Sequence, residues 1–262
     1  MDKPLVSIIT AIYNSPEALE KTIQSVIGQV NGNFEFIVVD GGSKDGTVDV
    51  IRKYENYISK WISETDNGIY DALNKGIRLA TGKWIHILNA GDTYFSSCTL
   101  QKLEPFFISN DNSILFGDVI KVYHKKEILL RSNQNLDKGQ YQMPVCHQGL
   151  FIAGSIHQEI GVYDTKWRVA ADFDFLLKCL KKQYQYFYIN QTIATFDFHG
   201  LSSNSTAGPR ENFKILLNNK YHLVSSVIRW LIFGSISWAV LFLKRYRFVR
   251  SLIYLKNKWR YL

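Results

Sequence analysis

The first hundred residues alternate between short apolar runs and segments with helical periodicity, and this alternation limits the folds open to the chain. The apolar runs resemble strands that are buried on both faces. The expected strands are residues 5–10, 34–39, 60–63 and 84–88, and the expected helices are residues 16–30, 47–54 and 66–80. This order predicts an α/β fold with an open, mostly parallel sheet flanked by helices.

The second half of the chain has a less regular pattern. Its expected strands are residues 114–116, 119–123, 145–152, 186–189 and 193–196, and its expected helix is residues 172–182. Ligands of open α/β sheets bind outside the carboxyl ends of the strands. The polar segments that follow the first strands are therefore the candidate binding segments, namely residues 10–14, 40–45, 64–67 and 89–92.

The positive charge of the chain is confined to its C-terminal end. The formal net charge is +8, but residues 211–262 hold ten Lys and Arg against the single acid Glu211, so the other 210 residues carry a net charge of −1. A near-neutral body disfavours nucleic acid as a partner. The three cysteines form no CxxC pair, which fits a reducing compartment. We also expect no signal peptide, because residues 1–4 lead directly into the first strand.

The basic end of the chain has the composition of a membrane-binding tail. Residues 223–243 contain one charge, Arg229, and at 1.5 Å per residue they reach about 30 Å, barely the thickness of a bilayer core. The apolar residues that follow recur at helical spacing among Lys and Arg, as in helices that lie on anionic lipid. The alternative is a helix pair that packs on the core or on a second copy in a homodimer.

Three acids stand where they could perform chemistry. Asp92 closes a strand, where one carboxylate can hold Mg²⁺ or Mn²⁺ together with phosphate oxygens and water. Asp172 begins an apolar helix and could act as a general base at a cleft edge. Asp40 closes the second strand, where it could bind a base or ribose. Each has a structural alternative, a turn for Asp40 and Asp92 and helix capping for Asp172.

The order of these segments resembles the family 2 glycosyltransferases, above all bacterial enzymes that build exopolysaccharide, colanic acid or O-antigen repeat units. The resemblance covers about residues 5–200. It is carried by VSIITAIYN (residues 6–14), FIVVDGGSKDGT (36–47), SETDNGIYDALNKG (63–76) and LNAGD (88–92). It implies a GT-A fold, a nucleotide-sugar donor, a divalent cation (Mn²⁺ or Mg²⁺) and inversion at the anomeric carbon.

Site residues follow from position within the matching motifs. The resemblance assigns Asp172 as the catalytic base and Asp92 as the metal ligand. Residues implied at the nucleotide-sugar site are Thr10, Ala11, Tyr13, Asp40 (to uracil), Asp66, Asn74 and Gly91. Residues implied on the acceptor or diphosphate side are His147, Gln148 and His199.

The sequence departs from the family pattern at three positions. The metal motif usually has two acids, but residues 90–92 supply only Asp92. Leu73 stands where an Arg is usual, and Ala171 stands where an acid often precedes the base. These changes bear on metal dependence and on one nucleotide contact.

The implied domain organisation has two parts. Residues 1–221 would form the GT-A domain, with a nucleotide-sugar-binding half (1–95) and an acceptor half (96–221), and residues 222–262 the apolar and basic helical tail. The implied enzyme is an inverting hexosyl- or N-acetylhexosaminyltransferase. It would move sugar from a UDP-sugar to a lipid-linked bacterial surface polysaccharide, at the cytoplasmic face of the inner membrane. The alternative is a catalytically inactive, membrane-attached scaffold of the same fold.

Overall fold

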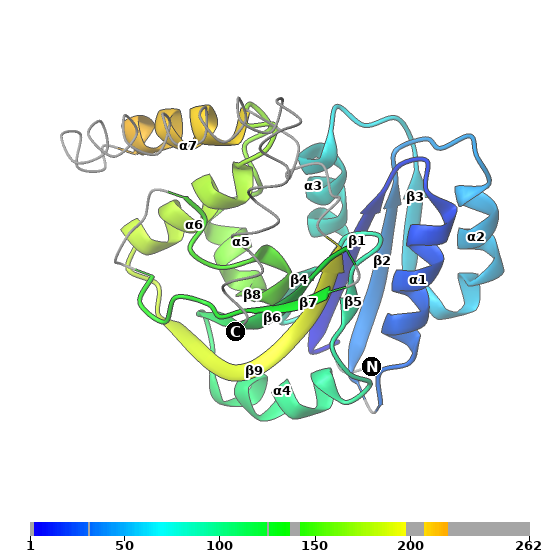
Figure 1. The fold of residues 1–262 in the computed structure, drawn as a ribbon, viewed down its shortest axis with the longest axis horizontal. Coiled ribbons are helices and arrows are strands. Elements are labelled where there is room, and N and C mark those ends of the chain that lie inside the picture. The colour runs from blue at the N-terminus through cyan, green and yellow to red at the C-terminus, as the bar shows by residue number, and fades with distance from the viewer. Residues whose placement is uncertain (1–2, 31, 125, 137–141, 198–206, 220–262) are drawn as a thin grey trace. The chain divides into compact units, whose positions relative to one another are not determined.

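The computed structural model describes residues 3–30, 32–124, 126–136, 142–197 and 207–219, and Figure 1 shows its fold. The described chain confirms the predicted α/β class, with helices packed on a nine-stranded sheet. The strands are β1 (Val6–Ile12), β2 (Phe34–Asp40), β3 (Lys60–Ser63), β4 (Trp84–Ile87), β5 (Thr93–Tyr94), β6 (Ile114–Tyr123), β7 (Lys126–Leu130), β8 (Leu150–Ala153) and β9 (Tyr186–Asp197). The helices are α1 (Pro16–Ile27), α2 (Thr47–Lys53), α3 (Ile69–Leu79), α4 (Thr99–Ser109), α5 (Gly154–Ile160), α6 (Ala171–Lys181) and α7 (Ala207–Asn218), with short 3₁₀ helices η1 (Glu55–Tyr57) and η2 (His147–Gly149).

The first half forms the parallel part of the sheet. The strand order is β3-β2-β1-β4-β8-β6-β9-β5, with β7 paired to β6, and β1 to β4 are mutually parallel where they pair. Figure 1 shows α1 and α2 on one side of these strands and α3 on the other. Every residue of β1 is buried, as its uninterrupted apolar run predicts. Strand β1 therefore presents only its carboxyl-end loop to a ligand.

A buried carboxylate ties the amino ends of these strands together. Glu35 accepts hydrogen bonds from Ser7 Oγ (2.6 Å), Lys60 Nζ (2.9 Å) and the backbone nitrogen of Gly82 (3.1 Å). Burial alone would raise the pKa of Glu35, but its hydrogen-bond donors lower that pKa to about 2. These contacts connect the strands at their amino-terminal ends, which lie opposite the candidate binding loops.

The second half is more continuous than its sequence pattern predicts. The expected strands 114–116 and 119–123 form one bulged strand, β6, and the expected strands 186–189 and 193–196 form one long strand, β9. Gly117 lies at the bulge, where a Cβ atom would be 2.6 Å from the carbonyl oxygen of Gln191. The close approach of the two backbones therefore requires glycine at this position. That glycine interrupts the apolar pattern that would otherwise indicate one continuous strand.

Four further segments differ from the prediction. Of the expected strand 145–152, only β8 is extended, because η2 precedes it. Helix α4 was not predicted, because it contains Pro105 and proline disfavours the interior of a helix. Helix α5 was not expected. Helix α3 begins at Ile69 rather than at residue 66, after Gly68 with a φ of 116°.

Strand β9 returns the second half of the chain to the first. Figure 1 shows β9 as a long curved strand, with α4 on its convex side and α5 and α6 on its concave side. Near its end β9 pairs with β5, where Thr195 lies opposite Thr93. Residues that follow β4 and residues that end β9 therefore lie close together.

The chain divides into two compact units after Gly208. The first unit contains the sheet, and most of α7 belongs to the second. His199 and the predicted tail, residues 222–262, lie outside the described residues. In the part of the chain that the structure describes, every helix is too short or too polar to cross a membrane.

Candidate active site

Two acids that the sequence singles out are contacted by neighbouring residues of η2. Gln148 Nε2 donates a 3.1 Å hydrogen bond to Asp92 Oδ2, and His147 Nδ1 lies 3.9 Å from Asp172 Oδ2. Gln148 is buried, and its carbonyl oxygen lies 2.9 Å from the Nε2 atom of the buried His86. The structure therefore brings together the predicted base, the predicted metal ligand and the predicted acceptor-side pair.

The carboxylate of Asp172 has one anchored oxygen and one free oxygen. Asp172 lies in the first turn of α6. Its Oδ1 atom accepts hydrogen bonds of 2.9 Å from the Phe173 backbone nitrogen and from the Tyr70 hydroxyl. Among the described residues its Oδ2 atom accepts none, and the side chain is 18% exposed. Oδ2 is therefore the atom that can take a proton from a ligand.

Tyr70 is a site residue that sequence reasoning missed. Its hydroxyl lies 2.9 Å from Asp172 Oδ1 and 3.0 Å from the carbonyl oxygen of Val169. Burial and the charge of Asp172 raise the pKa of Tyr70, so the hydroxyl remains a donor at neutral pH. Helical spacing of four places Tyr70 on the same face of α3 as Asn74, but no local pattern reveals its partner Asp172, which lies 102 residues away.

Asp92 lies in a tight turn between β4 and β5. Thr22 Oγ1 donates to the carbonyl oxygen of Asp92 (2.7 Å) and accepts from the backbone nitrogen of Gly91 (2.9 Å). Gly91 has a φ of 94°, which favours glycine at this position. Burial raises the pKa of Asp92 to about 7; the Gln148 bond and the charge of Lys21 oppose this shift, and Asp197 adds to it. Asp92 is thus a buried carboxylate whose backbone position is fixed by the hydrogen bonds of this turn.

The residues around Asp92 fit a cation that binds together with phosphate. In the described segments, no group of three His, Cys, Asp or Glu side chains is placed to form a complete metal cage. However, Asn89 Oδ1 is buried and has no hydrogen-bond partner within those segments, and the backbone nitrogen of Asp92 donates to the carbonyl oxygen of Asn89 (3.0 Å). One carboxylate, an amide oxygen, phosphate oxygens and water form a donor set that Mg²⁺ and Mn²⁺ accept.

An exposed tyrosine and a buried carboxylate meet at Gly41. A Cβ atom at Gly41 would lie 3.1 Å from Asp66 Oδ2 and 3.2 Å from Tyr13 Cδ2. Tyr13 is 66% exposed, whereas Asp66 is largely buried and ion-paired with Lys75, which also contacts Glu64 at 2.8 Å. Burial raises the pKa of Asp66, and Lys75 opposes the shift. Tyr13 and Asp66 therefore form a corner at Gly41, and Tyr13 is the member of this corner that is exposed to a ligand.

Asp40 organises its own loop. It is fully buried, and its carboxylate accepts hydrogen bonds from the backbone nitrogens of Gly42 (3.2 Å) and Ser43 (3.0 Å), from Ser43 Oγ and from Ser63 Oγ (2.6 Å). Four donors match the acceptor capacity of a carboxylate. This geometry supports the turn alternative for Asp40 and gives the predicted uracil contact no support.

Three other predicted nucleotide residues are buried. Thr10 Oγ1 donates to the carbonyl oxygen of Leu88 (2.6 Å), and Ala11 lies in the core. Asn74 donates to the carbonyl oxygen of Tyr163 (2.8 Å) and accepts from its backbone nitrogen (2.9 Å). Both ends of the Asn74 amide are therefore committed to joining α3 to the second half, and its geometry gives the predicted ribose contact no support.

Comparison with known proteins identifies the family. The model of "Glycosyl transferase family 2" matches residues 7–156. This chain belongs to that family. It is similar to a "PGL/p-HBAD biosynthesis glycosyltransferase" of Mycobacterium tuberculosis, with 32% identity over 209 residues that cover 78% of this chain and 81% of the relative. An uncharacterized glycosyltransferase of the same species is 32% identical over 181 residues, 67% of this chain and 68% of the relative.

Solved structures share the fold of this glycosyltransferase. TarS 1–349 of S. aureus in complex with UDP-GlcNAc has a TM-score of 0.66 and 16% identity, and the match covers 82% of this chain and 65% of that chain. A mannosyltransferase from Pyrobaculum calidifontis in complex with GDP-Man and Mn²⁺ has a TM-score of 0.62 and 16% identity, covering 96% of this chain and 83% of the other. This chain thus spans about two thirds of the TarS fragment. The predicted GT-A type fold is confirmed.

The family membership confirms the predicted enzyme class, a glycosyltransferase. The particular resemblance to colanic acid and O-antigen enzymes stays a prediction. So do the roles of the site residues, for which the geometry supports Asp172, Asp92, Tyr13 and Asp66.

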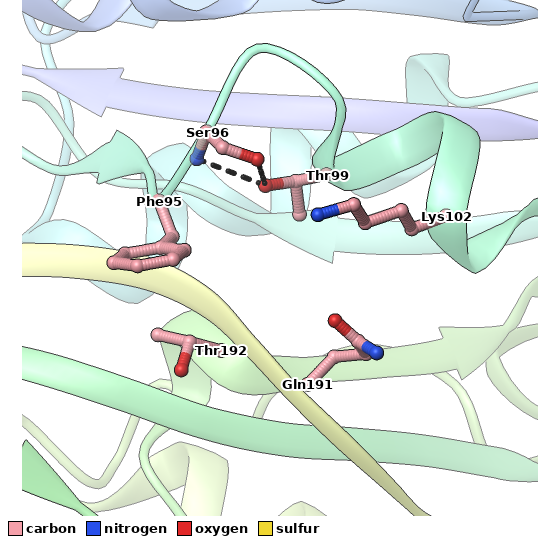
Figure 2. A pocket seen from close by; sticks show the side chains of 6 residues that line it. All are labelled: Phe95, Ser96, Thr99, Lys102, Gln191 and Thr192. Carbon is pink, nitrogen blue, oxygen red and sulfur yellow. Dashed lines mark hydrogen bonds between the residues drawn. The ribbon is translucent and has the colours of Figure 1, made fainter.

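A separate small pocket of this glycosyltransferase lies between the start of α4 and β9. Figure 2 shows its lining, in which Thr99 Oγ1 lies 3.1 Å from the Ser96 backbone nitrogen. The lining residues are Phe95, Ser96, Thr99, Lys102, Gln191 and Thr192. None of these six is an acid or a histidine, so this pocket lacks the groups that the proposed chemistry needs.

Proposed function

We propose that this glycosyltransferase moves a hexosyl or N-acetylhexosaminyl group from a UDP-sugar to an acceptor hydroxyl, with inversion at the anomeric carbon. The observation that carries the proposal is the carboxylate of Asp172, with Oδ1 anchored by Tyr70 and the Phe173 nitrogen and Oδ2 free of donors among the described residues. Such a carboxylate can accept a proton from one fixed direction, as general base catalysis requires.

In the proposed step, the acceptor hydroxyl gives its proton to Asp172 Oδ2 while its oxygen forms a bond to the anomeric carbon. The bond from that carbon to the donor diphosphate breaks, and its electron pair goes to the diphosphate oxygen. Attack from the face opposite the diphosphate inverts the configuration.

The other acid of the site serves the leaving group. A divalent cation, Mn²⁺ or Mg²⁺, bound at Asp92 would supply positive charge against the charge that develops on the diphosphate. Gln148, which donates to Asp92 Oδ2, would fix the orientation of that carboxylate. Asn89 Oδ1 is the second protein oxygen available there.

The donor nucleotide would bind at the corner formed by Tyr13, Gly41 and Asp66. The exposed Tyr13 ring offers an aromatic face for a base, and the absent side chain at Gly41 lets a ligand approach the backbone. The UDP-GlcNAc complex of TarS supports a UDP-sugar, and the GDP-Man and Mn²⁺ complex of the mannosyltransferase supports cation use. A GDP-sugar is therefore the competing donor in the test.

The acceptor would be a lipid-linked saccharide of a bacterial surface polysaccharide, and the enzyme would act at the cytoplasmic face of the inner membrane. The support is the charge distribution, since the basic, apolar end of the chain suits an anionic membrane surface. The relative named for PGL/p-HBAD biosynthesis is consistent with a role in building a glycoconjugate.

The proposed function is tested by UDP release from UDP-glucose, UDP-galactose and their N-acetyl forms, with GDP-mannose for comparison and a lipid-linked acceptor mimic. We expect Asp172→Asn to lower transfer at least about 100-fold because it removes the proton acceptor. UDP binding by the variant, measured by calorimetry, should be unchanged.

The matched control is Asp111→Asn, because the Asp111 side chain is 79% exposed and, within the described part of the chain, pairs only with Lys83. Normal turnover by Asp172→Asn would remove Asp172 from its role. Absence of nucleotide release from every donor by the wild-type enzyme would instead favour the inactive scaffold.

A further inference from the structure

His147 lies between Asp172 and the turn that carries Asp92. Its Nδ1 atom is 3.9 Å from Asp172 Oδ2, and its Nε2 atom is 2.9 Å from Asn89 Nδ2. The imidazole side chain is 29% exposed. One ring therefore spans the distance from the proposed proton acceptor to the turn that carries Asp92.

The two contacts select one tautomer of the ring. The Asn89 amide nitrogen donates to Nε2, so a neutral ring carries its hydrogen on Nδ1, the atom that faces the carboxylate. The opposite tautomer would turn a nitrogen lone pair toward Asp172 Oδ2, and these two acceptors repel. Burial lowers the pKa of His147, and the charge of Asp172 opposes that shift.

This tautomer excludes His147 as the base. The Nε2 lone pair is occupied by Asn89, and Nδ1 carries a hydrogen, so neither nitrogen can accept a proton from a substrate. Asp172 Oδ2, in contrast, has two lone pairs. One can face His147 while the other receives the acceptor hydroxyl.

We propose that His147 is a positioning residue: its Nδ1–H orients the free oxygen of Asp172, and its Nε2 anchors the ring to Asn89 in the turn that carries Asp92. It would thereby fix the direction of the base relative to the leaving diphosphate. The inference rests on the proposed function. The separation of 3.9 Å is longer than a hydrogen bond and would shorten when substrate closes the site, as catalytic contacts often do.

Two substitutions separate the two contacts of the ring. The amide nitrogen of Asn, a donor, lies as many bonds from Cβ as His Nδ1 does, and the amide oxygen of Gln, an acceptor, lies as many bonds from Cβ as His Nε2 does. His147→Asn therefore retains a donor near Asp172 and gives up the Asn89 contact, whereas His147→Gln does the reverse. Both variants keep a polar amide at the same position, so each serves as the matched control of the other.

We expect His147→Gln to lower kcat by about 10- to 100-fold, with the KM for the UDP-sugar changed by less than about threefold, because misalignment of a base affects the chemical step. His147→Asn should retain at least about ten times the kcat of His147→Gln. Equal losses in both variants, or a loss confined to KM, would overturn the inference. Thermal unfolding midpoints identify any variant that fails to fold.

A second measurement does not depend on activity. Nitrogen-15 shifts of the histidine rings in the full-length wild-type enzyme report which ring nitrogen carries the hydrogen, and the missing signal in His147→Asn assigns His147. We expect the Nδ1–H form, and the Nε2–H form would overturn the inference. If the wild type releases no UDP from any donor, the proposed function fails, while the tautomer still decides whether His147 presents a donor to Asp172.

Discussion

At the scale of single residues, Asp92 is a carboxylate whose environment favours the neutral form. It is 7% exposed, and among the described residues its side chain has one hydrogen-bond donor, Gln148, and no ion pair. Burial raises its pKa to about 7, so Asp92 holds a proton at neutral pH far more readily than an ordinary aspartate does. A cation that binds this group must displace that proton.

We predict that Asp92→Asn abolishes stabilisation by metal. In the presence of UDP, Mn²⁺ should raise the thermal unfolding midpoint of the wild type and leave that of the variant unchanged. Because ionised Asp92 predominates above its pKa, the rise should be larger at pH 8 than at pH 6. Apparent Mn²⁺ affinity should fall up to about tenfold for each pH unit below 7.

Differential scanning fluorimetry over a Mn²⁺ titration measures this effect. Asp111→Asn should respond to Mn²⁺ like the wild type, since its carboxylate lies on the surface. An equal Mn²⁺ response of Asp92→Asn and the wild type would contradict the assignment of Asp92 as a ligand.

At the scale of secondary-structure elements, α3 joins the first half of the chain to the second half. Two residues one helical turn apart make these contacts, Tyr70 to Asp172 and Asn74 to the backbone of Tyr163. The Tyr70 and Tyr163 rings also pack edge to face, with centroids 5.4 Å apart. The position of the proposed base therefore depends on the docking of this helix.

We predict that Asn74→Ala lowers stability without weakening nucleotide binding. The substitution removes two buried hydrogen bonds and leaves the backbone of Tyr163 unsatisfied, which should cost about 2–4 kcal/mol of unfolding free energy. The Kd for UDP of the folded variant should match that of the wild type. Urea unfolding and calorimetry measure the two quantities.

Asn110→Ala is the comparison for this effect, because the Asn110 amide bonds at the exposed end of α4 and its loss should cost less than about 1 kcal/mol. A large rise in the UDP Kd for Asn74→Ala, with unchanged stability, would restore the nucleotide contact that the family resemblance implies.

The first half of the fold was predictable because its signals are local. Continuous apolar runs identify buried parallel strands, and Pro16 correctly places the start of α1. The second half depends on distant partners. Gly117 interrupts the apolar pattern of β6. Glycine is required there because the backbone at Gln191 approaches it closely, and no local pattern reveals that neighbour. Pro105 likewise prevents the recognition of α4 from its sequence pattern.

The site was predictable to the same extent. Asp172 and Asp92 follow from motif positions, and η2 does bring them into one site. Asn74 occupies a motif position too, but its partner Tyr163 lies 89 residues away and determines what its amide does. Tyr70 gained its contact with Asp172 through the fold alone. Sequence patterns thus predict which residues are candidates, whereas long-range packing decides their contacts.

At the scale of the whole molecule, positive charge and chemistry belong to different parts of the chain. The acids of the candidate site lie in residues 1–210, which carry a net charge of −1, while residues 211–262 carry +9. Such a separation along the chain allows an anionic membrane to attract the basic part.

We predict that the full chain sediments with vesicles that contain phosphatidylglycerol and that a chain ending at residue 221 does not. Each base near anionic lipid contributes about 1 kcal/mol, and 1 M salt screens most of this attraction. Binding should therefore weaken as salt is raised, and vesicles of neutral lipid serve as the control. A full-length protein that stays in the supernatant with anionic vesicles would contradict the proposed membrane attachment.

The double contact of η2 also has a consequence for exchanging parts between family members. Residues 147 and 148 belong to the second half of the chain, yet both contact the first half. Gln148 contacts Asp92, and His147 contacts Asn89 as well as Asp172 of the second half. A chimera joined after residue 95 would import a foreign pair at these positions and mismatch both acids at once. An exchange of the first half should therefore include η2, so that its contacts with both acids are kept.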